Sequence, residues 1–527
     1  MRVLLVEPQY RRGRPERVEG QKVDEESLWY PPLGLMKLSR YHKERGDQVL
    51  FAHGIDKSLP LSQDLFGPPI DRIYVTTLFT FHFDAIVKTI KYYKELVSGT
   101  SARIFVGGIM ASLMPDEIFE ATGIFPIEGI IKSSKVLDPD LDGVDIDSLA
   151  PDYDLVDSHL YAVNNTYYGY TTRGCVNQCD WCGVRALEPK YVPYIDIKPM
   201  IKQMRAEYGD KPILKLMDNN VLASPRLGHI IEDLLSLGYG RGQRTTDAPR
   251  RGRVIDFNQG VDASFMSETN MALLAQLNVR PLRVAFDRID EKAKYVEAVD
   301  LAAKHGFTDF SNYMLFNFDD SPFDLYERLL VNIRLNEKFA KGVKKRDGPQ
   351  IYSYPMRYAP IYGGPGRPGV NKHRDFVMDG GDGRRDWLTS PRWTRRFIRS
   401  IEIMKGAAHG AISPTPSLAL RTIGETPEEF LTNLYMPEVL LRERNKHEKR
   451  VYKYEPSRPP GTGAVEDFRL FMLGLLRKAD DRFRLFHEAV SGNSVAMVRK
   501  GLEGCRDKEI RKWLALYDVK AASEEEQ

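Results

Sequence analysis

The stretch TTRGCVNQCDWCGVRA, residues 171–186, contains three of the four cysteines of this 527-residue chain. They are Cys175, Cys179 and Cys182, while the fourth, Cys505, lies far downstream. Thiolates bind soft metals and iron–sulfur clusters. A structural zinc site takes four ligands, usually as two cysteine pairs, whereas this stretch has three thiols, no second pair and no histidine. Three thiolates suit a cubane cluster in which one iron stays open for an exchangeable ligand.

The cysteine stretch comes directly after the first of six strands that the sequence predicts between residues 166 and 362. Helical patterns separate the strands, which are expected at Tyr167–Thr172, Pro212–Asp218, Arg253–Gln259, Leu282–Asp287, Asn312–Phe318 and Gln350–Met356. This alternation predicts a parallel partial barrel of six strand–helix units, in which chemistry takes place at the carboxyl ends of the strands. The cysteines therefore fall where such a barrel has its active site.

The remaining parts of the chain predict an α/β protein with further domains. Residues 1–124 predict a doubly wound, Rossmann-like domain, because short apolar runs begin at Val3, Gln48, Ile73 and Arg103 and helical patterns lie between them. Residues 125–165, rich in Asp, Ser and Pro, are expected to form a linker. Residues 363–390 predict a Gly- and Arg-rich loop, and residues 391–527 predict a helical C-terminal domain.

The spacing C-x3-C-x2-C, with Trp181 just before the last cysteine and Arg173-Gly174 leading in, resembles the radical S-adenosylmethionine (SAM) superfamily. The resemblance implies that the three cysteines hold a [4Fe–4S] cluster and that SAM binds the fourth iron through its amino and carboxylate groups. It also implies cleavage of SAM to a 5′-deoxyadenosyl radical, with an electron donor such as flavodoxin or ferredoxin. The alternatives are three thiols that cluster without a metal, or a zinc knuckle with a distant fourth ligand.

Polar residues at the ends of later strands are candidates for binding the cofactor beside Trp181. The resemblance implies that Asp218 accepts from the ammonium of SAM and that Asn219 bonds its carboxylate, although the Gly-Gly-Glu triplet common in the superfamily is absent. Asn258, at the end of the third strand, and Asp287, at the end of the fourth, are candidates for contacts with ribose or substrate. The alternatives are helix caps for the first pair and turn residues for the second.

The N-terminal domain resembles the cobalamin-binding domain found before many radical SAM barrels. The resemblance rests on Tyr30–Leu35, on Gly107-Gly108 and on Asp147–Tyr153, whereas the D-x-H-x-x-G loop that supplies a histidine ligand elsewhere is missing. Because a fold does not establish a cofactor, cobalamin binding and a degenerate domain both remain open. Cobalamin-dependent methylation is the first candidate reaction, and a cobalamin-free oxidation or rearrangement is the second. The sequence does not identify the substrate.

Composition gives no general preference for nucleic acid or membrane. The chain has 76 basic and 73 acidic residues, and its net charge is +3. The sequence has no apolar segment long enough for a bilayer and no signal-peptide pattern at the N-terminus, so a cytoplasmic protein is expected. Arginine-rich stretches at 241–253, 384–399 and 442–453 leave a non-catalytic zinc protein that binds nucleic acid as an alternative. Solvated surface is the favoured interpretation of these stretches because the charges balance.

Overall fold

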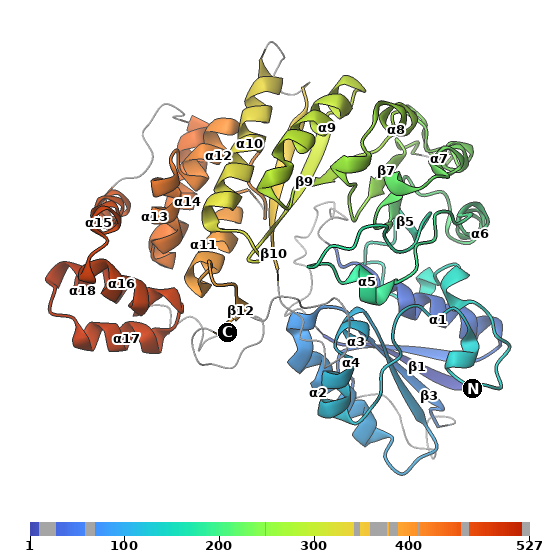
Figure 1. Cartoon of the computed structure of the whole chain (residues 1–527). Helices are drawn as coiled ribbons and strands as arrows, with labels where there is room; N and C mark the ends of the chain where they lie inside the picture. The colour runs from blue at the N-terminus through green and yellow to red at the C-terminus, as the bar shows by residue number, and fades with distance from the viewer. Residues whose placement is uncertain are drawn as a thin grey trace. The chain divides into compact units, whose positions relative to one another are not determined.

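The computed structural model describes residues 1–9, 28–57, 69–247, 249–341, 348–358, 377–378, 388–408, 410–454 and 463–518. The chain is a mixed α/β protein with parallel sheets and a helical C-terminal region (Figure 1). It divides into two compact units. The first unit comprises the described parts of Met1–Val261 and Ala272–Arg280, and the second comprises those of Asp262–Met271, Pro281–Pro360 and His373–Gln527.

The described strands are β1 Arg2–Glu7, β2 Gln48–His53, β3 Arg72–Thr77, β4 Arg103–Gly108, β5 Thr166–Gly169, β6 Ile213–Leu216, β7 Val254–Phe257, β8 Leu282–Ala285, β9 Asp309–Phe316, β10 Gln350–Arg357, β11 Val377–Met378 and β12 Leu388–Thr389. The α-helices up to the last parallel strand are α1 Leu33–Glu44, α2 Phe83–Leu96, α3 Ile109–Leu113, α4 Pro115–Thr122, α5 Val184–Leu187, α6 Lys198–Tyr208, α7 Leu227–Ser236, α8 Glu268–Leu274, α9 Lys292–Lys304 and α10 Pro322–Ala340. The later helices are α11 Arg395–Lys405, α12 Pro416–Ile423, α13 Pro427–Tyr435, α14 Glu438–Tyr454, α15 Ala464–Lys478, α16 Asp481–Ser491, α17 Val495–Gly504 and α18 Lys508–Asp518.

The N-terminal sheet has the strand order β2-β1-β3-β4 and all its strand pairs are parallel. Leu4 and Val6 pack with α2, α3 and α4 on one face, while Val3 and Leu5 pack with α1 on the other. Both faces are therefore covered, which explains why these strands read as continuous apolar runs. The prediction of a doubly wound N-terminal domain is confirmed.

The segment expected as a linker, residues 125–165, contributes to the core of this domain. Leu137, Leu141 and Ile146 are buried beside α1 on one face of the sheet. Asp147 follows directly and is almost completely buried. The segment therefore brings a charged side chain to the edge of the domain as well as connecting it to β5.

Six strands lie between residues 166 and 357, as the sequence predicts, and they form two parallel three-stranded sheets. In the first unit the order is β5-β6-β7, and in the second it is β10-β9-β8. A single barrel that joins the six strands stays a prediction. The strand β5 ends at Gly169, earlier than predicted, because the backbone nitrogens of Thr171 and Thr172 bond to the side chain of Asp218.

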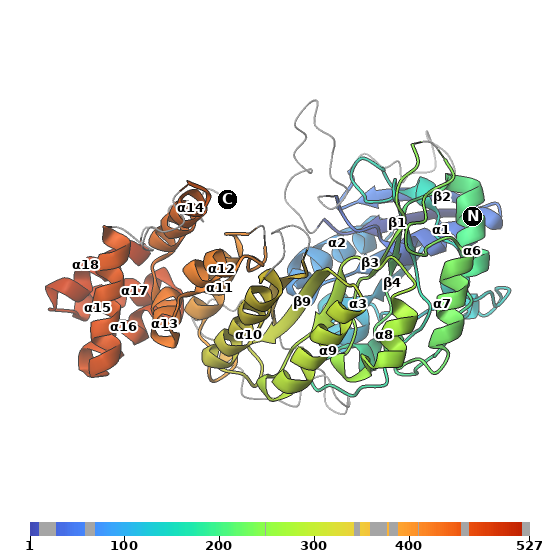
Figure 2. The same ribbon diagram turned by 90° about the horizontal axis from the view of Figure 1, so that it is seen from above.

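The C-terminal part of the second unit is helical, as predicted. Its aromatic core includes Phe397, Tyr435, Phe468, Phe486 and Trp513, all of which are buried. Helices α15 to α18 form one group (Figure 2). Most of the expected Gly- and Arg-rich loop at 363–390 lies outside the described residues. In the described parts of the chain, no helix has the length and apolar character required to cross a bilayer.

Candidate metal and cofactor site

The three clustered cysteines lie in the loop that joins β5 to α5. Gly174, directly before Cys175, has a φ of +69°, and a Cβ atom there would lie 2.7 Å from the carbonyl oxygen of Lys190. Glycine is therefore required at this position, both for its backbone conformation and for the close approach of the following chain. The backbone conformation and the close packing thus explain why a glycine follows Arg173.

Cys175, Cys179 and Cys182 are all partly exposed, and none forms a disulfide. The Sγ atom of Cys175 accepts from the backbone nitrogen of Asn177 at 3.4 Å and from Nδ2 of Asn220 at 3.9 Å. The oxygen of the same amide, Asn220 Oδ1, is buried and has no hydrogen-bond partner among the described residues. A buried oxygen of this kind beside a thiol fits a site that a bound group or a water completes.

The three thiols are not gathered around a common point in this structure. Within the described residues, no group of three or more His, Cys, Asp or Glu side chains is arranged to hold a metal ion. The donor set itself fits a [4Fe–4S] cluster, because three cysteines in one loop are available for thiolate ligation. These three cysteines would therefore be the residues that hold such a cluster.

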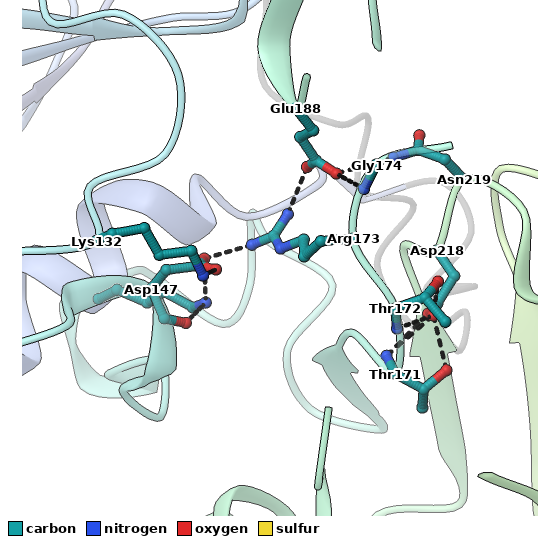
Figure 3. A network of polar contacts seen from close by, with 10 residues as sticks. Lys132, Asp147, Thr171, Thr172, Arg173, Gly174, Glu188, Asp218 and Asn219 are labelled. Carbon is teal, nitrogen blue, oxygen red and sulfur yellow. Dashed lines mark hydrogen bonds and ion pairs between the residues drawn. The ribbon is translucent and has the colours of Figure 1, made fainter. Parts of the chain in front are cut away.

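Arg173 anchors the start of the loop (Figure 3). Its buried guanidinium bonds to Glu188 Oε1 at 2.7 Å, pairs with Asp147, and lies 3.2 Å from the ring centroid of Tyr170. Burial alone lowers the pKa of Arg173, but Tyr170, Asp147 and Glu188 outweigh it, so the pKa is raised. Arg173 is therefore a fixed cation within the fold.

Asp147 receives two further cations on its other side. Lys37 Nζ lies 3.0 Å from Oδ1. Lys132 Nζ lies 3.1 Å from Oδ2 (Figure 3). Burial raises the pKa of Asp147, but the charges of Lys37 and Arg173 outweigh it and leave the pKa lowered. The N-terminal domain is thereby tied to the residue that precedes the cysteine loop.

Glu188 closes the loop from its far end. Its Oε2 atom accepts from the backbone nitrogen of Gly174 at 2.5 Å and from Asn219 Nδ2 at 3.0 Å (Figure 3). Sequence reasoning missed Glu188, and it missed the pairing of Arg173 with Asp147, because no motif links residues so distant along the chain. One indication of this pairing lay in the sequence: Arg173 precedes the cysteine motif, and Asp147 begins the Asp147–Tyr153 motif.

Asp218 is completely buried, and its carboxylate bonds to the start of the cysteine loop. Its Oδ1 accepts from Thr171 Oγ1 at 2.7 Å and from Thr172 Oγ1 at 2.8 Å, and both backbone nitrogens also donate to the carboxylate. Burial raises the pKa of Asp218, against the lowering effect of these hydrogen bonds. The helix-cap alternative is wrong for Asp218, because Asn220 precedes the next helical turn, Val221–Ala223.

The other expected site residues lie in both compact units. Trp181 lies partly exposed in the cysteine loop, and Asn219 contacts Glu188 at the start of the same network. Asn258 follows β7 in the same unit and donates to the Tyr30 hydroxyl. Asp287 belongs to the second unit, where its Oδ1 accepts from the backbone nitrogen of Leu315 at 2.8 Å and burial raises its pKa.

A cavity of about 200 Å³ lies in the N-terminal domain beside the ends of β3 and β4. Its wall is mainly apolar and includes Leu38, Phe105 and Ile127, and Lys37 and Arg173 also line it. Ligands of open α/β sheets bind at this edge, beyond the carboxyl ends of the strands. Arg173 therefore borders both this cavity and the cysteine loop.

The arginine-rich stretch at 384–399 does not form an exposed basic surface where it is described. Arg395, Arg396 and Trp393 are buried, and Arg399 pairs with Glu438 at 2.7 Å. Solvated surface is thus the wrong interpretation of these side chains, and they are equally unsuited to stack with nucleic acid. Residues 384–387 and the side chains of 447–453 lie outside the described parts.

Comparison with known proteins gives structural likenesses alone, since neither protein-family models nor curated proteins match the sequence. Two similar structures are of the radical S-adenosylmethionine methyltransferase TsrM from Kitasatospora setae. One, with cobalamin and a [4Fe–4S] cluster bound, has 15% identity and a TM-score of 0.44, with 64% of this chain and 73% of that chain covered. The other, with tryptophan substrate and a SAM analogue, has 15% identity and a TM-score of 0.42, with 63% and 71% covered.

A third similar structure is that of the apo, selenomethionine-labelled cobalamin-dependent S-adenosylmethionine radical enzyme OxsB. It has 14% identity and a TM-score of 0.47, with 98% of this chain and 83% of that chain covered. At such low identities and TM-scores, these likenesses decide neither the reaction nor the cofactors of this chain.

Proposed function

We propose that this chain is a radical SAM enzyme in which Cys175, Cys179 and Cys182 hold a [4Fe–4S] cluster. The observation that carries the proposal is the anchored loop, in which three thiols outside any disulfide lie between Gly174 and its hydrogen-bond partner Glu188. When bound, the cluster supplies the electron that cleaves SAM to a 5′-deoxyadenosyl radical. A flavodoxin or ferredoxin is the proposed electron donor, and the cytoplasm is the proposed location.

The described residues have distinct proposed roles around the cluster. Asp218 holds Thr171 and Thr172 in place, and Glu188 fixes the entry of the loop. Trp181 and Asn219 are proposed to contact SAM. Asn258 and Asp287 are proposed to contact ribose or substrate.

Methyl transfer with cobalamin is the first candidate reaction within this class. The cavity beside β3 and β4 supports it, because its wall is mainly apolar and it lies beyond the carboxyl ends of parallel strands, where open α/β sheets bind ligands. Leu38, Phe105 and Ile127 would contact such a ring, and Lys37 would meet a polar substituent. A cobalamin-free oxidation or rearrangement is the second candidate.

Anaerobic reconstitution of the full chain with iron and sulfide tests the proposal. We expect about four iron and four sulfide per chain, retained in Cys505→Ser, since Cys505 lies in the helical region. Cys179→Ala should lose most of the iron. One zinc per chain and no iron–sulfur absorption would instead favour the non-catalytic alternative. A bound corrinoid spectrum after growth with the vitamin would support methyl transfer over the cobalamin-free reactions.

A further inference from the structure

A polar row crosses one face of the β5-β6-β7 sheet. Tyr168 lies opposite Lys215 in the register, and Lys215 lies opposite Asp256. The neighbouring residues Leu214 and Ile255 point to the other face and are completely buried. Lys215 therefore stands in the middle of this sheet, on the face opposite the apolar core.

Lys215 is a partly covered cation whose carboxylate partner, Asp256, lies beyond hydrogen-bond distance. Its side chain is 17% exposed, and its Nζ atom lies 3.7 Å from Asp256 Oδ2. That separation is an ion pair too long for a hydrogen bond. A lysine in such a place has donors that suit an additional acceptor.

One donor from β6 and one from the residue after β7 converge on one oxygen at this face. Lys215 Nζ lies 2.9 Å from the hydroxyl oxygen of Tyr30, and Asn258 Nδ2 lies 3.0 Å from the same atom. Tyr30 comes from the segment before α1 and is 42% exposed. The hydroxyl of Tyr30 thus marks a position where an ammonium and an amide together hold an oxygen atom within reach of solvent.

We propose that Lys215 and Asn258 bind a carboxylate group of the substrate, whose oxygen takes the position of the Tyr30 hydroxyl. An ammonium and an amide N–H form stronger hydrogen bonds with an anionic oxygen than with a phenol. Asp256 reduces the local positive charge, which favours a singly charged carboxylate over a doubly charged phosphate. Naming the bound molecule as substrate rests on the proposed radical SAM function.

The carboxylate site lies on the sheet that carries the cysteine loop. Lys215 is in β6, three residues before Asp218, and Asp218 bonds to Thr171 and Thr172 at the start of that loop. A substrate held by its carboxylate at Lys215 and Asn258 would therefore be fixed to the same three strands that position the cluster ligands. Fixing one end of a substrate is a means of orienting it for reaction.

The test uses the full chain without cluster and hexanoate as the probe, followed by ligand-observed NMR. We expect hexanoate to bind more tightly than the uncharged hexanamide and than inorganic phosphate. Lys215→Met should weaken hexanoate binding about tenfold or more, and Asn258→Ala should weaken it several-fold. Lys202→Met, which removes an exposed lysine of α6, is the matched control and should bind like the wild type.

The Tyr30→Phe variant tests whether the Tyr30 hydroxyl only occupies the position of the carboxylate oxygen or itself binds the ligand. Because the hydroxyl competes for the same donors, this variant should bind hexanoate at least as tightly as the wild type. Equal binding by wild type and Lys215→Met, a preference for phosphate, or a tenfold loss in Tyr30→Phe would overturn the carboxylate site.

Iron content is measured separately on reconstituted protein, so the two proposals can fail independently. Protein that binds hexanoate through Lys215 but assembles no cluster would refute the radical chemistry alone. Cluster-loaded protein without Lys215-dependent binding would refute the carboxylate site alone.

Discussion

Glu188 accepts a hydrogen bond of 2.5 Å from the backbone nitrogen of Gly174, so the two ends of the cysteine loop are joined. Gly174 directly precedes Cys175, and Glu188 follows α5, after Cys182. All three thiols therefore lie inside one closed loop whose ends are also tied to Arg173. Closing a loop reduces the conformational freedom that ligand binding would otherwise have to remove.

Replacement of Glu188 by alanine should open this loop. The change leaves Arg173 with one carboxylate partner fewer in a buried place, so the free energy of unfolding should fall by roughly 3 kcal/mol. The iron content of the reconstituted Glu188→Ala variant should also be lower than that of the wild type. Denaturant unfolding of the metal-free chain and iron analysis of the reconstituted chain check the two effects.

Glu44→Ala is the matched control, because the Glu44 side chain is exposed and its pair with Arg40 spans 4.0 Å. Its effect on unfolding should be below about 1 kcal/mol. Equal iron content in wild type and Glu188→Ala would show that the closed loop does not help to hold the cluster.

Replacement of Asp218 by alanine should release the start of the loop. Thr171 and Thr172 would lose their shared acceptor while remaining buried, and we expect a loss of roughly 3 kcal/mol in the free energy of unfolding. Asp140→Ala, at an exposed position, should be neutral. Hydrogen exchange of the Thr171 and Thr172 amides should accelerate in Asp218→Ala, and unchanged exchange would contradict the assigned role.

The paired carboxylate of Asp147 predicts a pH-dependent contribution to stability. Because the pKa of Asp147 is lowered in the folded chain, the unfolded chain takes up the proton first as the pH falls. The stabilising contribution is therefore complete above about pH 4 and is lost as the pH falls further toward the folded pKa. Asp147→Asn should reduce the free energy of unfolding at neutral pH.

The difference between wild type and Asp147→Asn should shrink as the pH is lowered below about 4. Urea unfolding of the metal-free chain across this range measures it, with Asp140→Asn as the exposed control. A difference that stays constant with pH would show that ion pairing of Asp147 does not contribute.

Filling the N-terminal cavity should prevent corrinoid binding without affecting the iron–sulfur cluster. Ile127→Trp places a larger side chain in the cavity and should prevent corrinoid binding, while iron content stays near that of the wild type. Val136→Trp, at a position that is 57% exposed, is the control. Corrinoid absorption and iron analysis of the same samples give both readouts, and full corrinoid binding by Ile127→Trp would place that cofactor elsewhere.

The strands could be predicted from sequence because they are apolar and separated by helical patterns, as Val3 to Val6 illustrate. Their ends were less predictable, since β5 stops where Asp218, almost fifty residues later, takes the backbone hydrogen bonds of Thr171 and Thr172. The cysteines were identified by spacing within one loop, which is a local property. The contacts of Glu188 with Gly174 and of Lys215 with Tyr30 were not predictable, because they depend on how distant segments pack.

The formation of 5′-deoxyadenosine is the most direct measure of the central claim. Reconstituted wild-type protein, given SAM and a strong reductant under anaerobic conditions, should release 5′-deoxyadenosine, and Cys505→Ser should do so equally. Cys179→Ala should release none above the level without protein. Equal product from Cys179→Ala, or none from wild-type protein that carries about four iron per chain, would contradict the assignment of these cysteines to a SAM-cleaving cluster.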